Sequence, residues 1–248
     1  MTKRLLITGG SRGIGRATAL LAGARGWSVA VNYVSNAEAA QSAAEEVRAA
    51  GGEAIVVKGD VAVEADVIAM FDEAEAAFGG LDCVIANAGI VGPKAAVADM
   101  TLERMQRVVR TNVVGALLTA RETSKRLRRP MDAASASLVI LSSAAARIGS
   151  PDQYVDYAAS KGATDTMTLG LSKELAPLNI RVNAVRPGLI ETDIHASGGE
   201  PDRAWRLGAT VPMARPGTAK ETAEAITWLC SDEASYVTGA ILDVAGGR

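Results

Sequence analysis

Short apolar runs alternate along the chain with longer segments in which Ala, Leu and charged residues recur at helical spacing. Such runs, bounded by Gly, Asn or Asp, predict buried strands, and the longer segments predict helices. The expected strands cover residues 5–8, 27–33, 53–58, 82–86, 138–141, 179–185 and 240–244. The expected helices cover residues 16–25, 36–50, 63–78, 101–129, 157–176 and 219–230. Because strands and helices alternate, the pattern predicts an α/β fold with a parallel sheet.

Length and composition favour a single domain over residues 1–248. Its irregular segment at about 190–216 is expected to be a substrate loop. The chain is 48% hydrophobic but only 4% aromatic, so its core should consist mainly of small aliphatic side chains. A formal net charge of -2 gives no electrostatic reason to expect nucleic acid or an anionic membrane as a partner. The first apolar run is too short for a signal peptide or a membrane span, which favours a cytoplasmic protein.

No metal site is expected. The only cysteines, Cys83 and Cys230, lie in apolar segments far apart and are interpreted as buried free thiols. The one histidine, His195, has no neighbours at metal-ligand spacing, and is interpreted as structural or substrate-lining.

A glycine-rich turn follows the first expected strand and precedes the first expected helix. Glycines let the backbone approach a phosphate closely, and a helix start offers N–H groups to an anion. This order favours a dinucleotide pyrophosphate over a tight connection with no ligand. The candidate residues are Gly9, Ser11, Arg12, Gly13, Ile14 and Gly15.

The second expected strand ends at Asn32 and Tyr33, without the carboxylate that commonly binds the ribose 2′-hydroxyl of NAD. Arg12 could pair with a 2′-phosphate, so NADP(H) is preferred and NAD(H) is less favoured. The alternative for Arg12 is an exposed turn residue. Asp60 and Val61 follow the third strand, where Asp60 could meet the adenine or act as a helix N-cap.

Tyr157 and Lys161 are four residues apart in an expected helix, so both side chains project from one face. A free tyrosine titrates near pH 10 and needs a neighbouring cation to act as an acid–base catalyst at neutral pH. Lys161 could be that cation, although such a pair is more often an ordinary helix face.

Other candidates lie at or near the expected carboxyl edge of the sheet. Asn112 is an amide among apolar helical neighbours, which needs hydrogen-bond partners or a packing role. The 194–216 segment is expected to be irregular, like a lid. The remaining candidates are Asn87, Ala88 and Gly89 after the fourth strand, Ser142 and Ser143 after the fifth, and Pro187, Gly188, Ile190 and Thr192 after the sixth.

Taken together, these motifs resemble the short-chain dehydrogenase/reductase family over nearly the whole chain. The resemblance implies a single Rossmann-type, doubly wound domain with a seven-stranded parallel sheet, helices on both faces and commonly a homotetramer. It also implies that Tyr157 is the general acid or base and that Lys161 binds the nicotinamide ribose and lowers the pKa of the phenol.

The same resemblance implies roles for the other candidates. Ser143 would donate a hydrogen bond to the reacting oxygen, with the adjacent Ser142 as an alternative assignment, and Asn112 would hold a water next to Lys161. Ile190 and Thr192 would hold the nicotinamide carboxamide, and residues 87–89 would line the cofactor groove.

Within the family, the chain is similar to 3-ketoacyl-carrier-protein reductases and glucose 1-dehydrogenases. The region 176–179 lacks the basic residue expected of a carrier-protein reductase, and the insert at 130–137 disturbs the other basic docking surface. A small carbonyl or alcohol substrate is therefore favoured, with a pocket formed by residues 144–154 and 194–211. A thioester reductase and a non-catalytic NADP-binding protein remain alternatives.

Overall fold

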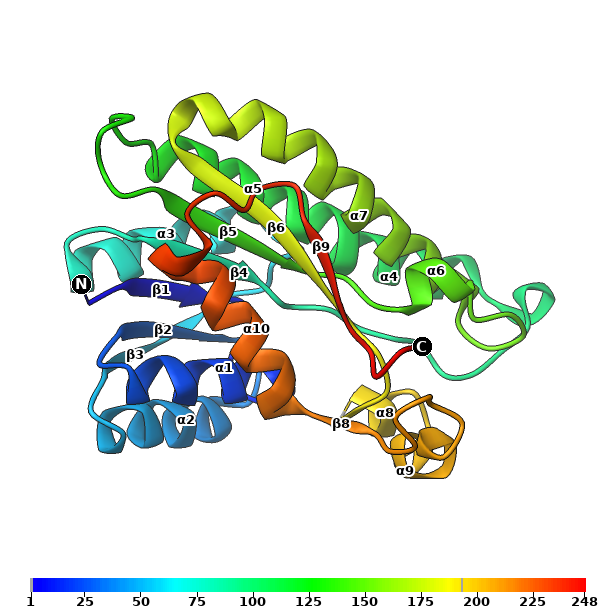
Figure 1. Cartoon of the computed structure of the whole chain (residues 1–248). Coiled ribbons are helices and arrows are strands. Elements are labelled where there is room, and N and C mark those ends of the chain that lie inside the picture. The colour runs from blue at the N-terminus through cyan, green and yellow to red at the C-terminus, as the bar shows by residue number, and fades with distance from the viewer. Residues whose placement is uncertain (1, 193) are drawn as a thin grey trace.

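In residues 2–192 and 194–248, which a computed structural model describes, seven strands form one parallel sheet. The strand order is β3-β2-β1-β4-β5-β6-β9 (Figure 1). The strands are β1 (Arg4–Ile7), β2 (Ser28–Tyr33), β3 (Glu53–Lys58), β4 (Cys83–Ala86), β5 (Ala136–Leu141), β6 (Ile180–Pro187) and β9 (Ile241–Val244). This confirms the predicted fold class. Since β5 begins at Ala136, the loop before it is shorter than the pattern predicted.

Helices cover both faces of this sheet (Figure 1). Helices α1, α2 and α10 pack on one face, and α3, α5 and α7 pack on the other. The principal helices are α1 (Gly13–Ala24), α2 (Ala37–Ala49), α3 (Glu64–Phe78), α4 (Leu102–Val109), α5 (Gly115–Arg126), α7 (Val155–Leu175) and α10 (Ala219–Cys230). In the described part of the chain, no helix is long and apolar enough to cross a membrane.

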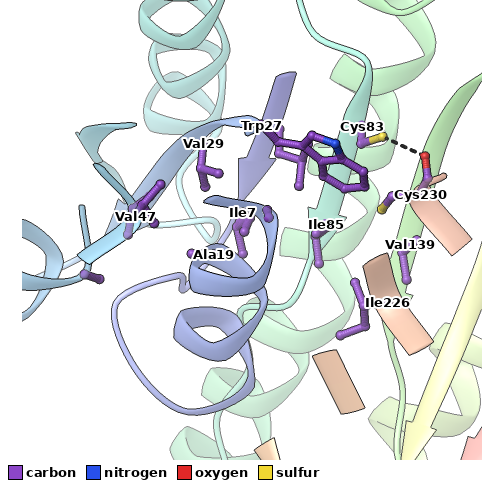
Figure 2. Close-up of a cluster of buried hydrophobic side chains, with 14 of the residues drawn as sticks. Ile7, Ala19, Trp27, Val29, Val47, Cys83, Ile85, Val139, Ile226 and Cys230 are labelled. Carbon is purple, nitrogen blue, oxygen red and sulfur yellow. Dashed lines mark hydrogen bonds between the residues drawn. The ribbon is translucent and has the colours of Figure 1, made fainter. Parts of the chain in front are cut away.

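The hydrophobic core is divided between the two faces, and successive strand residues alternate between them. In β1, Leu5 and Ile7 join the cluster under α1, α2 and α10, whereas Leu6 joins the cluster on the opposite face. Figure 2 shows the first cluster, with Trp27 and Ile85 packed against residues of α1 and α10. Because both faces are buried, the strands read as continuous apolar runs rather than as alternating ones.

The expected helical stretch over 101–129 is present from Leu102 to Arg126, but it is not α-helical throughout. Helix α4 ends at Val109, a π-helical segment covers Arg110–Val114, and α5 begins at Gly115. Such π segments insert wider turns into a helix and frequently mark functional sites. Asn112 lies at the centre of this one.

The 194–216 segment is more ordered than its sequence predicted. It contains the short helices α8 (Ile194–Ser197) and α9 (Arg203–Gly208). Around it, β7 (Ile190–Glu191) pairs in parallel with β8 (Gly217–Thr218). These four elements return the chain to the start of α10.

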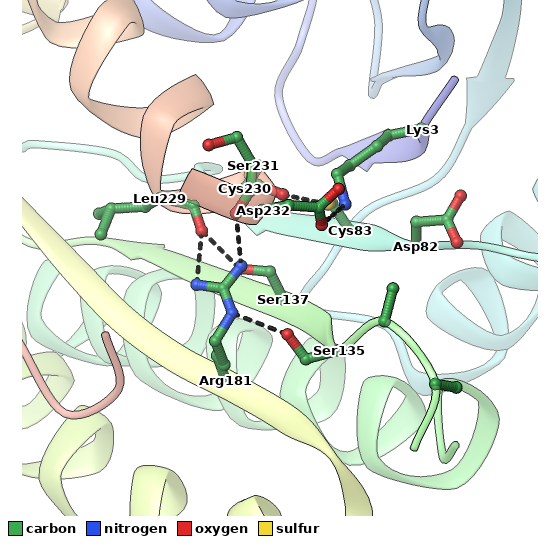
Figure 3. A network of polar contacts seen from close by, with 12 residues as sticks. Lys3, Asp82, Cys83, Ser135, Ser137, Arg181, Leu229, Cys230, Ser231 and Asp232 are labelled. Carbon is green, nitrogen blue, oxygen red and sulfur yellow. Dashed lines mark hydrogen bonds and ion pairs between the residues drawn. The ribbon is translucent and has the colours of Figure 1, made fainter. Parts of the chain in front are cut away.

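A buried cation joins β6 to the C-terminal end of α10. The Arg181 side chain in β6 is 5% exposed, and its Nη1 donates to Leu229 O at 2.8 Å. Its Nη2 donates to Ser231 O at 3.1 Å and its Nε to Ser135 Oγ at 3.0 Å (Figure 3). Burial lowers the pKa of Arg181. A cation at a helix C-terminus is favourable because it meets the negative end of the helix dipole.

We expect Arg181→Ala to lower the free energy of unfolding by about 2–4 kcal/mol, because it empties a buried site and removes the guanidinium donors to Leu229 O and Ser231 O. Urea unfolding followed by circular dichroism measures the loss. Arg128→Ala is the matched control, since Arg128 is exposed and its replacement should cost less than about 0.5 kcal/mol. Equal losses in the two variants would contradict a stabilising role for the Arg181 contacts.

Candidate active site

A cleft opens at the carboxyl ends of β1 and β4, around a cavity of about 410 Å³. The strand order reverses between these two strands, and open α/β sheets bind ligands at such a switch point. The cleft is lined by the predicted residues Gly9, Ser11, Arg12, Gly13, Ile14, Asn32, Tyr33, Asp60, Val61, Asn87, Ala88, Gly89, Ser143, Tyr157, Lys161, Pro187, Gly188, Ile190 and Thr192. Of the predicted site residues, Gly15 and Asn112 do not line it.

The glycine turn needs glycine for two separate reasons. Gly9 and Gly13 adopt positive φ angles of 63° and 54°. A Cβ on Gly15 would lie 2.5 Å from Gly9 O and 2.7 Å from Asn87 Nδ2, so only glycine fits there. Gly15 therefore packs closely behind the turn, and its contact with a ligand stays a prediction.

The start of α1 is suited to an anionic group. The first turn of a helix has N–H groups without intrahelical acceptors, and the N-cap residue Arg12 makes no side-chain cap bond to them. A Cβ on Gly13 would lie 3.5 Å from Thr192 Cγ2, so Thr192 closes over this turn from the opposite wall. The residues present therefore fit a dinucleotide whose phosphates meet α1.

Asn32 has a structural role that its sequence position did not reveal. Its side chain is 1% exposed, its Oδ1 accepts from Gly9 N at 2.9 Å, and its Nδ2 donates to Gly59 O at 2.9 Å. These bonds hold the glycine turn against the end of β3. Asn32 is therefore committed to the protein rather than available to a ribose.

Other side chains form the outer end of the cleft. Tyr33, Ser35 and Asn36 line it, together with the exposed Arg12. Ser35 and Asn36 were missed as candidates, although they directly follow the strand whose end was singled out.

Asp60 is not a helix N-cap. Helix α3 begins at Glu64, its N-cap Val63 has no side-chain cap, and Asp60 Oδ1 instead accepts from Ala62 N at 2.9 Å. Its place in the cleft lining leaves the contact with adenine as a prediction.

Ser143 and Tyr157 face one another at the inner end of the cleft. Burial raises the pKa of Tyr157, and a side-chain hydrogen bond with Ser143 acts to lower it. Ser143 Oγ also accepts from Ala145 N at 3.1 Å. By contrast, Ser142 Oγ donates to Lys161 O at 3.2 Å, so its hydroxyl turns toward the backbone of α7. Ser143 rather than Ser142 therefore lies against the phenol.

Lys161 is a buried cation beside the phenol ring. Its side-chain Nζ lies 5.6 Å from the centroid of the Tyr157 ring and donates to Leu141 O at 2.5 Å. Burial lowers the pKa of Lys161 to about 8, and the charge of Asp165 acts in the opposite direction. The pKa of Tyr157 is raised in this structure, because burial is the largest influence on it. The lowering of this pKa by Lys161 stays a prediction.

Asn112 ties two elements together behind the cleft. Its Oδ1 accepts from Ile90 N at 2.8 Å, and its Nδ2 donates to Ile90 O at 2.9 Å and to Ser160 Oγ at 3.0 Å. Ser160 Oγ in turn donates to Tyr157 O at 2.7 Å. Ser160, which sequence reasoning missed, therefore links Asn112 to the first turn of α7.

Gly89 lies between Asn112 and Lys161. A Cβ placed on it would lie 3.5 Å from both Asn112 Oδ1 and Lys161 Nζ. The two polar groups therefore approach the same small space, and the water-holding role of Asn112 stays a prediction.

The 187–192 segment forms the opposite wall. A Cβ on Gly188 would lie 2.7 Å from the Cα of Ala245, so glycine lets this wall pack on the end of β9. Pro187, Gly188, Ile190 and Thr192 all line the cleft. Their positions fit the carboxamide-binding role implied by the resemblance, which stays a prediction.

The outer wall beyond Tyr157 is formed by the start of α7 and the 194–216 segment. Tyr154 Oη donates to Glu200 Oε2 at 2.8 Å, while Arg203 Nη1 lies 2.7 Å from the same oxygen. Burial, followed by this bond to Glu200, raises the pKa of Tyr154 to about 12. The side chain of His195 lies outside the described part, so its predicted role is untested.

Two arginines in the cleft lining, Arg203 and Arg248, were missed from the sequence. Arg203 lies in a segment predicted to be irregular, and Arg248 follows the last strand without any motif. Neither position carried a signal, because only the tertiary fold brings them to the cleft.

Comparison with known proteins identifies the family. The family model described as Enoyl-(Acyl carrier protein) reductase matches residues 9–248. The chain belongs to the short-chain dehydrogenase/reductase family. As a member of that family it is an oxidoreductase that uses a nicotinamide dinucleotide.

Several short-chain dehydrogenase/reductase relatives resemble it over nearly their whole length. The "Uncharacterized oxidoreductase YgfF" of Escherichia coli is 51% identical, with 98% of each chain covered. A glucose 1-dehydrogenase of Gluconobacter oxydans is 36% identical over 99% of this chain and 91% of its own. The crystal structure of a 3-ketoacyl-(acyl-carrier-protein) reductase from Brucella melitensis complexed with NADH has a TM-score of 0.91, 31% identity and coverage of 99% and 98%.

The depressed pKa of Lys161 predicts a pH-dependent stability. Below pH 8 the folded protein carries the full cost of a buried charge, and above pH 10.5 the lysine is neutral in both folded and unfolded states. Between these limits, the free energy of unfolding of the wild type should rise relative to Lys161→Met, by up to about 3 kcal/mol. Urea unfolding of both proteins from pH 7 to pH 10 measures this difference. Parallel pH profiles would contradict the shift.

Proposed function

We propose that this protein transfers a hydride between NADP(H) and a ketone or secondary alcohol, with Tyr157 as the general acid or base. The observation that carries this proposal is the convergence of Ser143, Tyr157 and Lys161 on one cleft, which the glycine turn before α1 also lines. A protein that only binds the cofactor would not need this phenol. The reaction therefore fits the site better than a non-catalytic role.

The residues that would hold the cofactor extend along the cleft. Gly9 to Ile14 would receive the pyrophosphate at α1, and Ile190 and Thr192 the carboxamide. When bound, the nicotinamide supplies or accepts the hydride.

The chain's own groups handle the proton. In reduction, Tyr157 would donate its phenolic proton to the substrate oxygen, while Ser143 donates a hydrogen bond that stabilises the developing charge. Lys161 would return a proton through a water held near Asn112. Through Ser160, Asn112 also positions the backbone of Tyr157.

We further propose a preference for NADP(H) over NAD(H). The support is the exposed Arg12 in the cleft wall and the neutral residues Tyr33, Ser35 and Asn36 at its outer end. Asp60, at the end of β3, is the one acidic side chain among the described lining residues. The NADH in the Brucella melitensis structure belongs to that protein and leaves this preference untested.

The charge distribution favours a small substrate over a carrier protein. The basic end of α5 and the residues after it are largely neutralised, because Arg121 pairs with Glu64 and Arg129 with Asp82. Arg126 likewise pairs with carboxylates of α3. This face offers few free cations to an acidic carrier, so reduction of a carrier-bound thioester stays the alternative.

The family resemblance is the ground for expecting a homotetramer, and the short first apolar run is the ground for expecting a cytoplasmic location. A homotetramer and a cytoplasmic location stay predictions.

We expect Tyr157→Phe to reduce kcat by at least about 100-fold, because it removes the proton that the substrate oxygen needs. NADPH binding, measured by fluorescence titration, should be retained. Tyr236→Phe is the control, because Tyr236 is exposed away from the cleft and its change should not alter turnover. Full activity in Tyr157→Phe would refute the proposed role.

Arg12→Ala should reduce the ratio of kcat/KM for NADPH to that for NADH by roughly tenfold, because a charge-assisted contact is lost. The measurement uses one carbonyl substrate and both cofactors. Arg16→Ala provides a matched control on α1, since Arg16 pairs with Glu46 outside the cleft. An unchanged ratio in Arg12→Ala would exclude this arginine as the source of any preference.

A further inference from the structure

Two arginines from distant segments line the cleft wall beyond Tyr157, at the end of the cleft that contains Ser143 and Tyr157. Arg203 is the first residue of α9, and Arg248 follows the last strand. Both line the same cavity as the phenol.

Arg203 is held in place by aromatic and ionic contacts. Its guanidinium carbon lies 5.2 Å from the centroid of the Tyr154 ring, and its Nη1 lies 2.7 Å from Glu200 Oε2. Arg206 Nη2 lies 2.5 Å from the other oxygen of Glu200. One carboxylate therefore serves two guanidinium groups, and this cluster keeps an excess of positive charge.

Arg248 is positioned by a tight glycine turn. Gly246 and Gly247 have positive φ angles of 61° and 90°, and Arg248 N donates to Ala245 O at 3.2 Å. The turn packs on the 194–216 segment, where Met213 N donates to Gly246 O at 3.1 Å. This packing places Arg248 next to the segment that carries Arg203.

The positive charges of Arg203 and Arg248 act on one another, although Glu200 already pairs with Arg203. The pKa of Arg248 is lowered, first by burial and then by the positive charge of Arg203, with no described acidic side chain acting on it. Lys161 is a further cation in the lining of the same cavity. Like charges held close together in a half-buried site are costly unless an anion joins them.

This site is separate from the place expected for the cofactor phosphates. Those phosphates would meet Gly13 at the start of α1, across from Thr192. Arg203 instead stacks on Tyr154, one helical turn before Tyr157. An anion bound here would therefore belong to the molecule that Tyr157 acts on.

We propose that the substrate carries a carboxylate, which binds between Arg203 and Arg248 while its carbonyl group meets Ser143 and Tyr157. This inference rests on the proposed oxidoreductase function and adds the substrate class. The guanidinium group matches a carboxylate with two parallel N–H donors, which makes the recognition directional.

The test compares straight-chain oxo acids, whose ketone group lies at positions 2 to 6, against the methyl esters of the same acids. NADPH and NADH are the reductants. For the wild type, kcat/KM should be at least about tenfold higher for the best acid than for its ester, as expected for a charge-assisted contact. Arg248→Gln should lose about that factor on the acid and change little on the ester. Arg206→Gln is the matched control, because Arg206 also pairs with Glu200 but does not line the cleft, and it should retain the preference.

The outcomes separate this inference from the function on which it rests. If esters are reduced as efficiently as acids, and Tyr157→Phe abolishes this turnover, the carboxylate site is wrong and the oxidoreductase function stands. If Arg248→Gln weakens NADPH binding in a fluorescence titration and leaves the acid-to-ester ratio unchanged, the arginine serves a cofactor phosphate and the inference is wrong. If no carbonyl compound or alcohol is turned over, the proposed function fails and the substrate class fails with it.

Discussion

Hydrogen bonds that Asn87 donates to Thr8 and Gly9 hold the carboxyl ends of β1 and β4 together, and the cleft depends on them. Asn87 Nδ2 donates to Thr8 O at 2.8 Å and to Gly9 O at 3.0 Å, while Thr8 Oγ1 accepts from Asn87 N at 3.0 Å. Where the chain leaves β1 and β4, these bonds give the buried polar groups hydrogen-bond partners. Gly15 packs against the same amide, so the turn, the start of α1 and the end of β4 form one unit.

Much of the fold was predictable because burial on both faces makes each strand a short apolar run with glycine or asparagine at its end. The cleft was predictable for the same reason, since parallel strands place all their following turns on one edge. The π segment was not predictable, because its apolar spacing is compatible with a continuous helix. The order of the 194–216 segment was missed, because its helices are too short to show a period.

A site residue could be predicted from the sequence only where the folded chain leaves its side chain free to meet a ligand. Asn32 has the position of a ribose-binding residue, yet Gly9 and Gly59 use its amide. Asn112 reads as an amide in need of partners, and Ile90 and Ser160 supply them. Residue spacing places a side chain on an edge or a face, but it does not show which neighbours engage it. Arg248 is the extreme case, because no local pattern connects it to Tyr157.

Burial acts on both members of the pair at the centre of the cleft and favours the neutral form of each. It raises the pKa of Tyr157 and lowers that of Lys161 to about 8. At neutral pH the phenol therefore keeps the proton that a carbonyl oxygen would receive in the proposed reduction. Alcohol oxidation would need the phenolate, and here the hydrogen bond with Ser143 is the contact that acts in its favour. In the proposed mechanism, the balance between burial and this bond would therefore set how readily one phenol serves both directions of the reaction.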